Sequence, residues 1–210
     1  MNGWQKEAGA TGERNGAKPA ASRGNGRRVG LWQRDAARVL DDLRLKELLA
    51  AYMPRLVGTV PIGIDVAASD LDVICEVSDL RTWCAYVRET FGHLQDFRCS
   101  ADGSDSATAN FRCEGWEIEL FGQNRPTGEQ NGYRHMVVEE RLLRLLPQAS
   151  RERIISWKAA GIRTEPAFAR LLALAGDPYQ ALLELGIRTD EELARLISEA
   201  GIPRQDPRRV

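Results

Sequence analysis

Residues 69–77 read Ser-Asp-Leu-Asp-Val-Ile-Cys-Glu-Val, an apolar run that begins with two carboxylates one residue apart. Alternate side chains of a strand lie on one face, so Asp70 and Asp72 are expected to point the same way, with Cα atoms roughly 7 Å apart. Two like charges at that separation destabilise each other unless water or a cation lies between them. The stretch therefore predicts either a solvated strand end or a metal site.

The composition is that of an ordinary globular protein, because 43% of its 210 residues are hydrophobic and 28% are charged. The net charge of −1 favours neither nucleic acid nor a membrane surface as a partner. No apolar run approaches the roughly 20 residues that a membrane span needs. No apolar stretch follows the charges near the N-terminus, which argues against a secretory signal. We therefore expect a cytoplasmic protein without membrane contact.

The four cysteines are widely spaced and form no CxxC pair: Cys75, Cys84, Cys99 and Cys113. This spacing gives little support to a zinc site or to thioredoxin-like chemistry. We expect free thiols that pack as small hydrophobic side chains in a reducing compartment.

The chain divides into four parts by composition. Residues 1–30 are rich in Gly, Ala, Asn, Arg and Ser without apolar periodicity, and we expect a disordered tail. Residues 31–125 mix strand and helix patterns, residues 126–203 show only helix patterns, and residues 204–210 are expected to be a flexible end. This order predicts an α+β domain with a mixed sheet flanked by helices, followed by a C-terminal helical bundle.

Hydrophobic spacing and turn residues predict the individual elements. The expected helices cover residues 33–52, 79–91, 129–146, 151–160, 164–175, 177–185 and 189–200. The expected strands cover residues 56–60, 70–77, 94–99, 107–113 and 116–121. Asp79 or Ser78 is expected to cap its helix, and Thr164 and Thr189 are each expected to cap the helix that they precede.

Two features flank the acidic pair. Upstream, Gly58 permits close approach of a ligand to the backbone, and Thr59 adds a hydroxyl group suited to phosphate oxygens. Downstream, Glu117 and Glu119 share one face of a predicted strand. Each feature alone fits an ordinary turn or an amphipathic strand.

Together these residues resemble the nucleotidyltransferase superfamily. Its pattern is Gly-Ser, then an Asp-x-Asp pair about a dozen residues on, then a third carboxylate on a later strand. Here Gly58-Thr59 precedes Ser69-Asp70-Leu71-Asp72 at close to that spacing, and the match covers residues 55–123. The segments 58–72, 121–123, 130–136 and 164–168 also look like a bacterial family of uncharacterised proteins within this superfamily.

The resemblance implies an activity and its residues. Asp70, Asp72 and a third acid would hold two Mg²⁺ or Mn²⁺ ions and catalyse transfer of a nucleotidyl group from a nucleoside triphosphate to a hydroxyl. Glu119 is preferred as the third acid because it lies deeper in the strand, with Glu117 as the alternative. The nucleotide phosphates would be held by Gly58, Thr59 and Ser69. Thr replaces the commoner Ser, and a Glu as third acid leaves open whether this copy is catalytic.

Further polar residues cluster around the start of a predicted helix. Arg134 could pair with a phosphate. Four others are expected to form a wall of the pocket: Gln123, Gln130, Asn131 and His135. A hydrogen-bonded structural role is the alternative for the histidine, and it is favoured over catalysis. Lys158 and Arg163 are expected to be solvated surface charges.

The sequence leaves three functions open. The first is a Mg²⁺-dependent nucleotidyltransferase acting on a small molecule or a protein hydroxyl, because the near-neutral charge argues against a long nucleic acid as acceptor. The second is a module that binds a nucleotide or a partner protein without turnover. The third retains only the fold, with the acids as solvated strand ends.

Overall fold

The computed structural model describes residues 29–101 and 105–203, with side chains from residue 33 onward. The predicted tail lies outside the described residues up to residue 28, and so does the predicted flexible end, residues 204–210. The first helix begins at Val29, four residues before its expected start.

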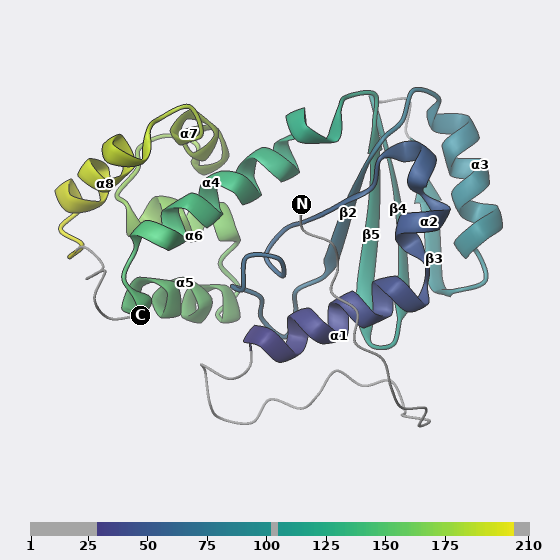
Figure 1. Cartoon of the computed structure of the whole chain (residues 1–210), viewed down its shortest axis with the longest axis horizontal. Coiled ribbons are helices and arrows are strands. Elements are labelled where there is room, and N and C mark those ends of the chain that lie inside the picture. The colour runs from purple at the N-terminus through teal and green to yellow at the C-terminus, as the bar shows by residue number, and fades with distance from the viewer. Residues whose placement is uncertain (1–28, 102–104, 204–210) are drawn as a thin grey trace.

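A five-stranded mixed sheet forms the centre of the N-terminal part (Figure 1). Its strands are β1 (Arg55–Val57), β2 (Leu71–Glu76), β3 (Gln95–Ser100), β4 (Ser106–Cys113) and β5 (Trp116–Gln123). The strand order is β1-β2-β5-β4-β3, with β2 and β5 parallel and the other pairs antiparallel. The predicted mixed sheet is therefore confirmed.

The first strand is shorter than predicted. It ends at Val57 because Gly58 takes a φ of +79°, a left-handed conformation that turns the chain away from the sheet. The turn places the next residues at the end of β1, directly beside β2.

The prediction of one continuous helix over residues 33–52 is wrong. The chain instead forms α1 (Val29–Asp42), α2 (Leu45–Leu48) and the 3₁₀ turn η1 (Ala50–Tyr52). Arg44 has a φ of 51°, which breaks the helix. After this break Leu45 and Leu49 become buried, so burial of two leucines outweighs helix continuity.

One face of the sheet packs on α1, α2 and α3 (Leu80–Phe91) to form a first hydrophobic core. Asp79 caps α3 as expected, accepting hydrogen bonds from the backbone N–H groups of Arg81 and Thr82. Buried Trp116 donates its indole N–H to Asp35 Oδ2 at 2.9 Å, which fixes α1 against β5.

The C-terminal helices gather beside the sheet, at the left of Figure 1, while α3 lies at the right. They are α4 (Asn131–Leu145), α5 (Gln148–Ala159), α6 (Thr164–Leu171), α7 (Pro178–Leu185) and α8 (Asp190–Glu199), preceded by the 3₁₀ turn η2 (Thr127–Glu129). They enclose a second core, to which the loop residues Ile62 and Ile64 also contribute. The predicted α+β class with a C-terminal helical bundle is confirmed.

The two predicted threonine caps have different outcomes. Thr189 forms a capping box with Glu192 at the start of α8. Thr164 does not cap α6, because it is the first helical residue and the helix has no side-chain cap hydrogen bond. The same helix ends at Leu171, four residues early, and Ala173 then takes a φ of 53°.

The helices and the cysteines also bear on the expectations from the sequence. Among the residues that the structure describes, none of the helices combines the length and apolar character that crossing a bilayer requires. All four cysteines are free thiols, with Cys75 and Cys84 buried in the core, as expected.

Candidate functional site

A cavity of about 720 Å³ lies between the second face of the sheet and the C-terminal helices. On β2, the side chains of Leu71 and Val73 enter the first core, whereas Asp72 and Ile74 face the cavity. The α4 helix packs on the sheet at Gly132. A Cβ at this position would lie 3.5 Å from Val57 Cγ2, an ordinary van der Waals contact. The cavity volume falls in the range of about 300–1,000 Å³ that is usual for small-molecule sites.

Three carboxylates of the sheet line this cavity. Asp72 pairs in register with Glu119 of the parallel strand β5, so their side chains leave the same face side by side. Asp70 lies two residues before Asp72, is exposed, and immediately precedes β2. The pairing of β2 with β5 cannot be read from the sequence. The fold therefore adds that Glu119 lies beside Asp72.

The electrostatics of the carboxylates show mutual repulsion. Burial, together with the charges of Asp70 and Glu119, raises the pKa of Asp72 to about 7. Burial and the charge of Asp70 also raise the pKa of Glu119. These carboxylates are therefore poorly compensated by neighbouring groups, and a bound cation would relieve the repulsion.

Glu117 occupies a different environment. Its side chain is exposed and lies 3.4 Å from the guanidinium of Arg112, and it does not line the cavity. Glu119, in contrast, is adjacent to Asp72. Of the two glutamates, Glu119 is therefore the one that lies in the cavity beside Asp72.

The donor chemistry of the site can be compared with that of a metal ion. Within residues 29–101 and 105–203, no group of three His, Cys, Asp or Glu side chains is arranged as a ready-made metal centre. Mg²⁺ commonly uses one or two carboxylates together with substrate phosphates. Asp70, Asp72 and Glu119 supply hard oxygen donors of the type that Mg²⁺ prefers, and substrate phosphates would have to complete the coordination.

The turn after β1 is held against the acidic pair. At Gly58 a Cβ atom would overlap Oδ2 of Asp72, so only glycine permits this approach. Thr59 Oγ1 lies 3.3 Å from Ser69 Oγ, and Ser69 Oγ accepts a hydrogen bond from the backbone N–H of Val66 at 2.9 Å. The two hydroxyls close the loop between β1 and β2. Gly58, Thr59 and Ser69 all line the cavity.

The start of α4 forms another part of the wall. Gln123, Gln130, Asn131 and His135 line the cavity. Gln130 is 1% exposed, and its amide N–H group donates to the carbonyls of Cys75 and Arg125, both at 2.9 Å. Gln130 therefore anchors the helix to the end of β2.

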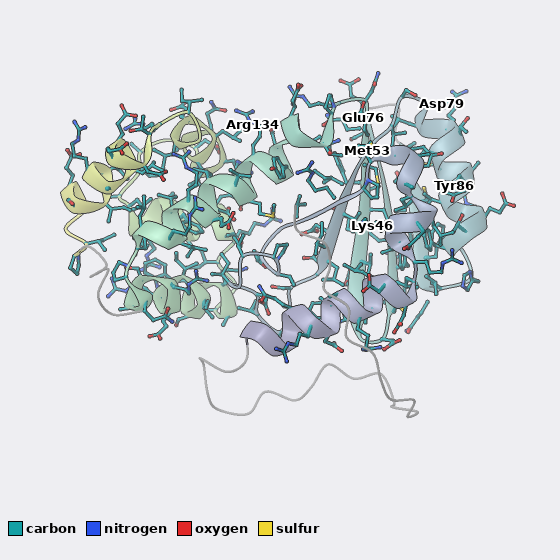
Figure 2. The ribbon with its side chains drawn as sticks, in the orientation of Figure 1. Lys46, Met53, Glu76, Asp79, Tyr86 and Arg134 are labelled. Carbon is teal, nitrogen blue, oxygen red and sulfur yellow. The ribbon has the colours of Figure 1, made fainter. Side chains whose placement is uncertain are left out.

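His135 and Arg134 differ in their placement. His135 Nε2 lies 3.0 Å from the carbonyl oxygen of Tyr179, and its Nδ1 lies 3.5 Å from Glu165 Oε1. These contacts correspond to the hydrogen-bonded structural histidine considered above. Arg134 (Figure 2) is exposed and does not line the cavity, and its guanidinium lies 3.5 Å from Asn131 Oδ1.

The expectation of a solvated surface lysine at position 158 is wrong. Lys158, in the last turn of α5, is partly buried and lines the cavity. Burial lowers its pKa to about 8, against the opposing charges of Glu139, Asp65 and Glu165. Arg163 is exposed as expected, yet it also lines the cavity.

Two acids of the helical wall escaped the sequence analysis. Glu139 of α4 is 3% exposed and Glu165 of α6 is partly exposed, and both line the cavity. Burial raises the pKa of Glu139 well above its ordinary value. The spacing of four residues between His135 and Glu139 was the available signal, because it places both side chains on one helical face.

Comparison with known proteins gives a family and one structural likeness. A search of curated proteins finds no match. Among solved structures, the polymerase core of TRAMP, an RNA surveillance complex, matches with a TM-score of 0.43 and 14% sequence identity. The match covers 79% of this chain and 56% of that chain, so this chain spans less than two thirds of the matched protein.

The family model described as "Domain of unknown function (DUF4269)" matches residues 38–185, well over half of the chain. This match agrees with the expectation of a family without a known activity. The protein therefore belongs to the DUF4269 family.

Proposed function

We propose that this protein is a divalent-cation-dependent nucleotidyltransferase that transfers a nucleoside monophosphate from a nucleoside triphosphate to a hydroxyl of a small molecule or protein. The observation that carries the proposal is the pairing of Asp72 with Glu119 on parallel strands, beside Asp70 and the Gly58 turn. This is the arrangement that the motif resemblance implies.

The residues of the cavity divide into two tasks. Asp70, Asp72 and Glu119 would hold one or two Mg²⁺ or Mn²⁺ ions, and when bound such ions neutralise phosphate charge and lower the pKa of an acceptor hydroxyl. Gly58 and Thr59 would bind the terminal phosphates through backbone N–H groups and the hydroxyl. Ser69 would support this loop through its contact with Thr59.

The basic residues of the cavity complete the phosphate environment. Lys158 and Arg125 line the same space as the carboxylates, and the charge of Lys158 acts on Asp72. They are better placed for the triphosphate than Arg134, which the sequence analysis nominated. In the reaction the acceptor oxygen would form a bond to the α-phosphorus while pyrophosphate leaves with the bridging oxygen, and the hydroxyl proton passes to water. Positioning and charge neutralisation are the main sources of rate in such transfers.

A nucleotide-binding module without turnover is the second candidate. It is favoured by the absence, among the described residues, of a ready-made group of three metal ligands. Both candidates require a nucleotide in the same cavity, and they differ only in catalysis.

Thermal melting with ATP, with and without Mg²⁺, tests the shared requirement. A ligand at 100 times its Kd adds about 2.7 kcal/mol of stability. We expect stabilisation only when ATP and Mg²⁺ are both present, and we expect Asp72→Asn to abolish it. Glu117→Gln is the matched control, because this exposed carboxylate lies outside the cavity. Failure of the wild-type protein to respond to any nucleotide would refute the proposal.

Release of pyrophosphate separates the two candidates. Protein that binds Mg²⁺ and ATP is incubated with a panel of hydroxyl-bearing acceptors, and pyrophosphate is measured. Release that depends on an acceptor and on Asp70 supports the transferase. Tight binding without release for any acceptor supports the binding module.

A further inference from the structure

The helical wall of the cavity carries charges that the proposed nucleotide site does not use. Glu139 lies on α4 and Glu165 on α6, across the cavity from the sheet carboxylates. Both are within electrostatic reach of Lys158, whose charge acts between the two walls. The acceptor must enter the same cavity, so these side chains are placed to select it.

Glu139 is the most informative of these groups. Its side chain lines the cavity although the residue is only 3% exposed. Among the described residues, neither a hydrogen bond nor a close ion pair is made by its carboxylate, and its neighbours act only through longer-range charge. A buried carboxyl group without a bonded partner is costly to ionise, and burial accordingly raises the pKa of Glu139. A cationic ligand group placed beside it in the cavity would offset that cost.

Acidic side chains outnumber basic side chains in the lining of the cavity. Five carboxylates line it, against three side chains of Lys and Arg: Asp70, Asp72, Glu119, Glu139 and Glu165, against Arg125, Lys158 and Arg163. A nucleoside triphosphate with two divalent cations brings roughly no net charge. The carboxyl group of Glu139 therefore gains no cationic partner from the nucleotide, and burial, which raises its pKa, favours its neutral form until a cationic group lies beside it.

We propose that Glu139 and Glu165 form an acceptor subsite for a small alcohol that also carries an ammonium group. This inference rests on the proposed function, because only a transferase would use the bound alcohol as an acceptor. The ammonium group binds the two wall carboxylates, and the hydroxyl thereby faces the sheet carboxylates. Partly buried Glu165 lies 3.5 Å from Nδ1 of His135, whose Nε2 contacts the carbonyl oxygen of Tyr179 on α7.

Isothermal titration calorimetry of the full chain at pH 7 tests this subsite without nucleotide. Diaminopropanol is the probe, and glycerol is its control, because glycerol has hydroxyls in place of both ammonium groups. Diaminopropanol is expected to bind at least tenfold more tightly than glycerol. A charged hydrogen bond of about 1.5–3 kcal/mol corresponds to tenfold or more in Kd. Glu139→Gln is expected to remove this difference, whereas Glu140→Gln, which changes the exposed neighbour on α4, is expected to retain it.

The results separate the subsite from the proposed function. Equal binding of the two probes, or a preference that survives Glu139→Gln, overturns the subsite even if Mg²⁺ and ATP bind as proposed. Asp72→Asn is expected to lose nucleotide binding and to keep the preference for diaminopropanol. If the wild-type protein binds no nucleotide but still prefers diaminopropanol, the proposed function is refuted and the subsite is not. If Glu139→Gln does not fold, Glu165→Gln provides the same comparison, and an unchanged preference there also overturns the subsite.

Discussion

Replacing Asp72 by Asn should stabilise the protein in the absence of metal. Burial and the charges of Asp70 and Glu119 raise the pKa of this carboxyl from 3.8 to about 7 in the folded state. The shift of about three pKa units, at about 1.36 kcal/mol for each, corresponds to about 4 kcal/mol. At pH 8 the wild-type protein bears this cost, because Asp72 is ionised in the folded and unfolded states alike.

The sign of the pH dependence follows from the same shift. As pH falls from 7 towards 4, the folded protein takes up a proton on Asp72 before the unfolded chain does, so the wild-type protein gains stability. The advantage of Asp72→Asn should therefore be about 4 kcal/mol at pH 8 and close to zero near pH 4.

Urea unfolding followed by tryptophan fluorescence measures this difference, because Trp83 and Trp116 are buried. The buffer contains EDTA, and the measurement is repeated with Mg²⁺, which should reduce the difference by stabilising only the wild-type protein. Glu117→Gln is the control and should change stability by less than about 0.5 kcal/mol, because that side chain is exposed. If Asp72→Asn has no stabilising effect at pH 8, the carboxylate is well solvated and the electrostatic reasoning is wrong.

Three further substitutions test other parts of the account. Gly58→Ala should destabilise the fold by about 1–2 kcal/mol, because a left-handed backbone is strained for alanine, and should abolish Mg²⁺-dependent nucleotide stabilisation in a melting assay. Gln130→Leu removes one buried and one partly buried hydrogen bond, to the carbonyls of Cys75 and Arg125, so urea unfolding should show a loss of about 2–3 kcal/mol. Glu119→Gln should abolish the nucleotide response that Glu117→Gln retains; the opposite pattern would make Glu117 the third acid.

The sheet strands were the most predictable part of the fold. In β4 and β5 buried side chains alternate with more exposed ones, and turn residues separate these two strands, which are local signals. The break at Arg44 was not predictable, because the leucine spacing through residues 33–52 fits one continuous helix. Only the packing of Leu45 and Leu49 into the first core, a tertiary contact, accounts for the break.

The candidate site divides in the same way. The sequence predicts one face for Asp70 and Asp72, because they are two residues apart in an expected strand, and both line the cavity although β2 begins only at Leu71. That Glu119 joins them depends on the pairing of β2 with β5, which are more than 40 residues apart in the chain and have no local signal for their register. Lys158 and Glu139 were missed because a charged residue in a helix is usually solvated, and only the approach of the helical bundle to the sheet encloses them.

A crystal structure of the protein with Mn²⁺ and a non-hydrolysable ATP analogue tests the central claim most directly. The account predicts anomalous density for Mn²⁺ in contact with carboxylate oxygens of Asp70 and Asp72, at about 2.1 Å, with the phosphates beside Gly58. Mn²⁺ bound elsewhere, or a nucleotide that avoids this cavity at saturating concentration, would contradict it.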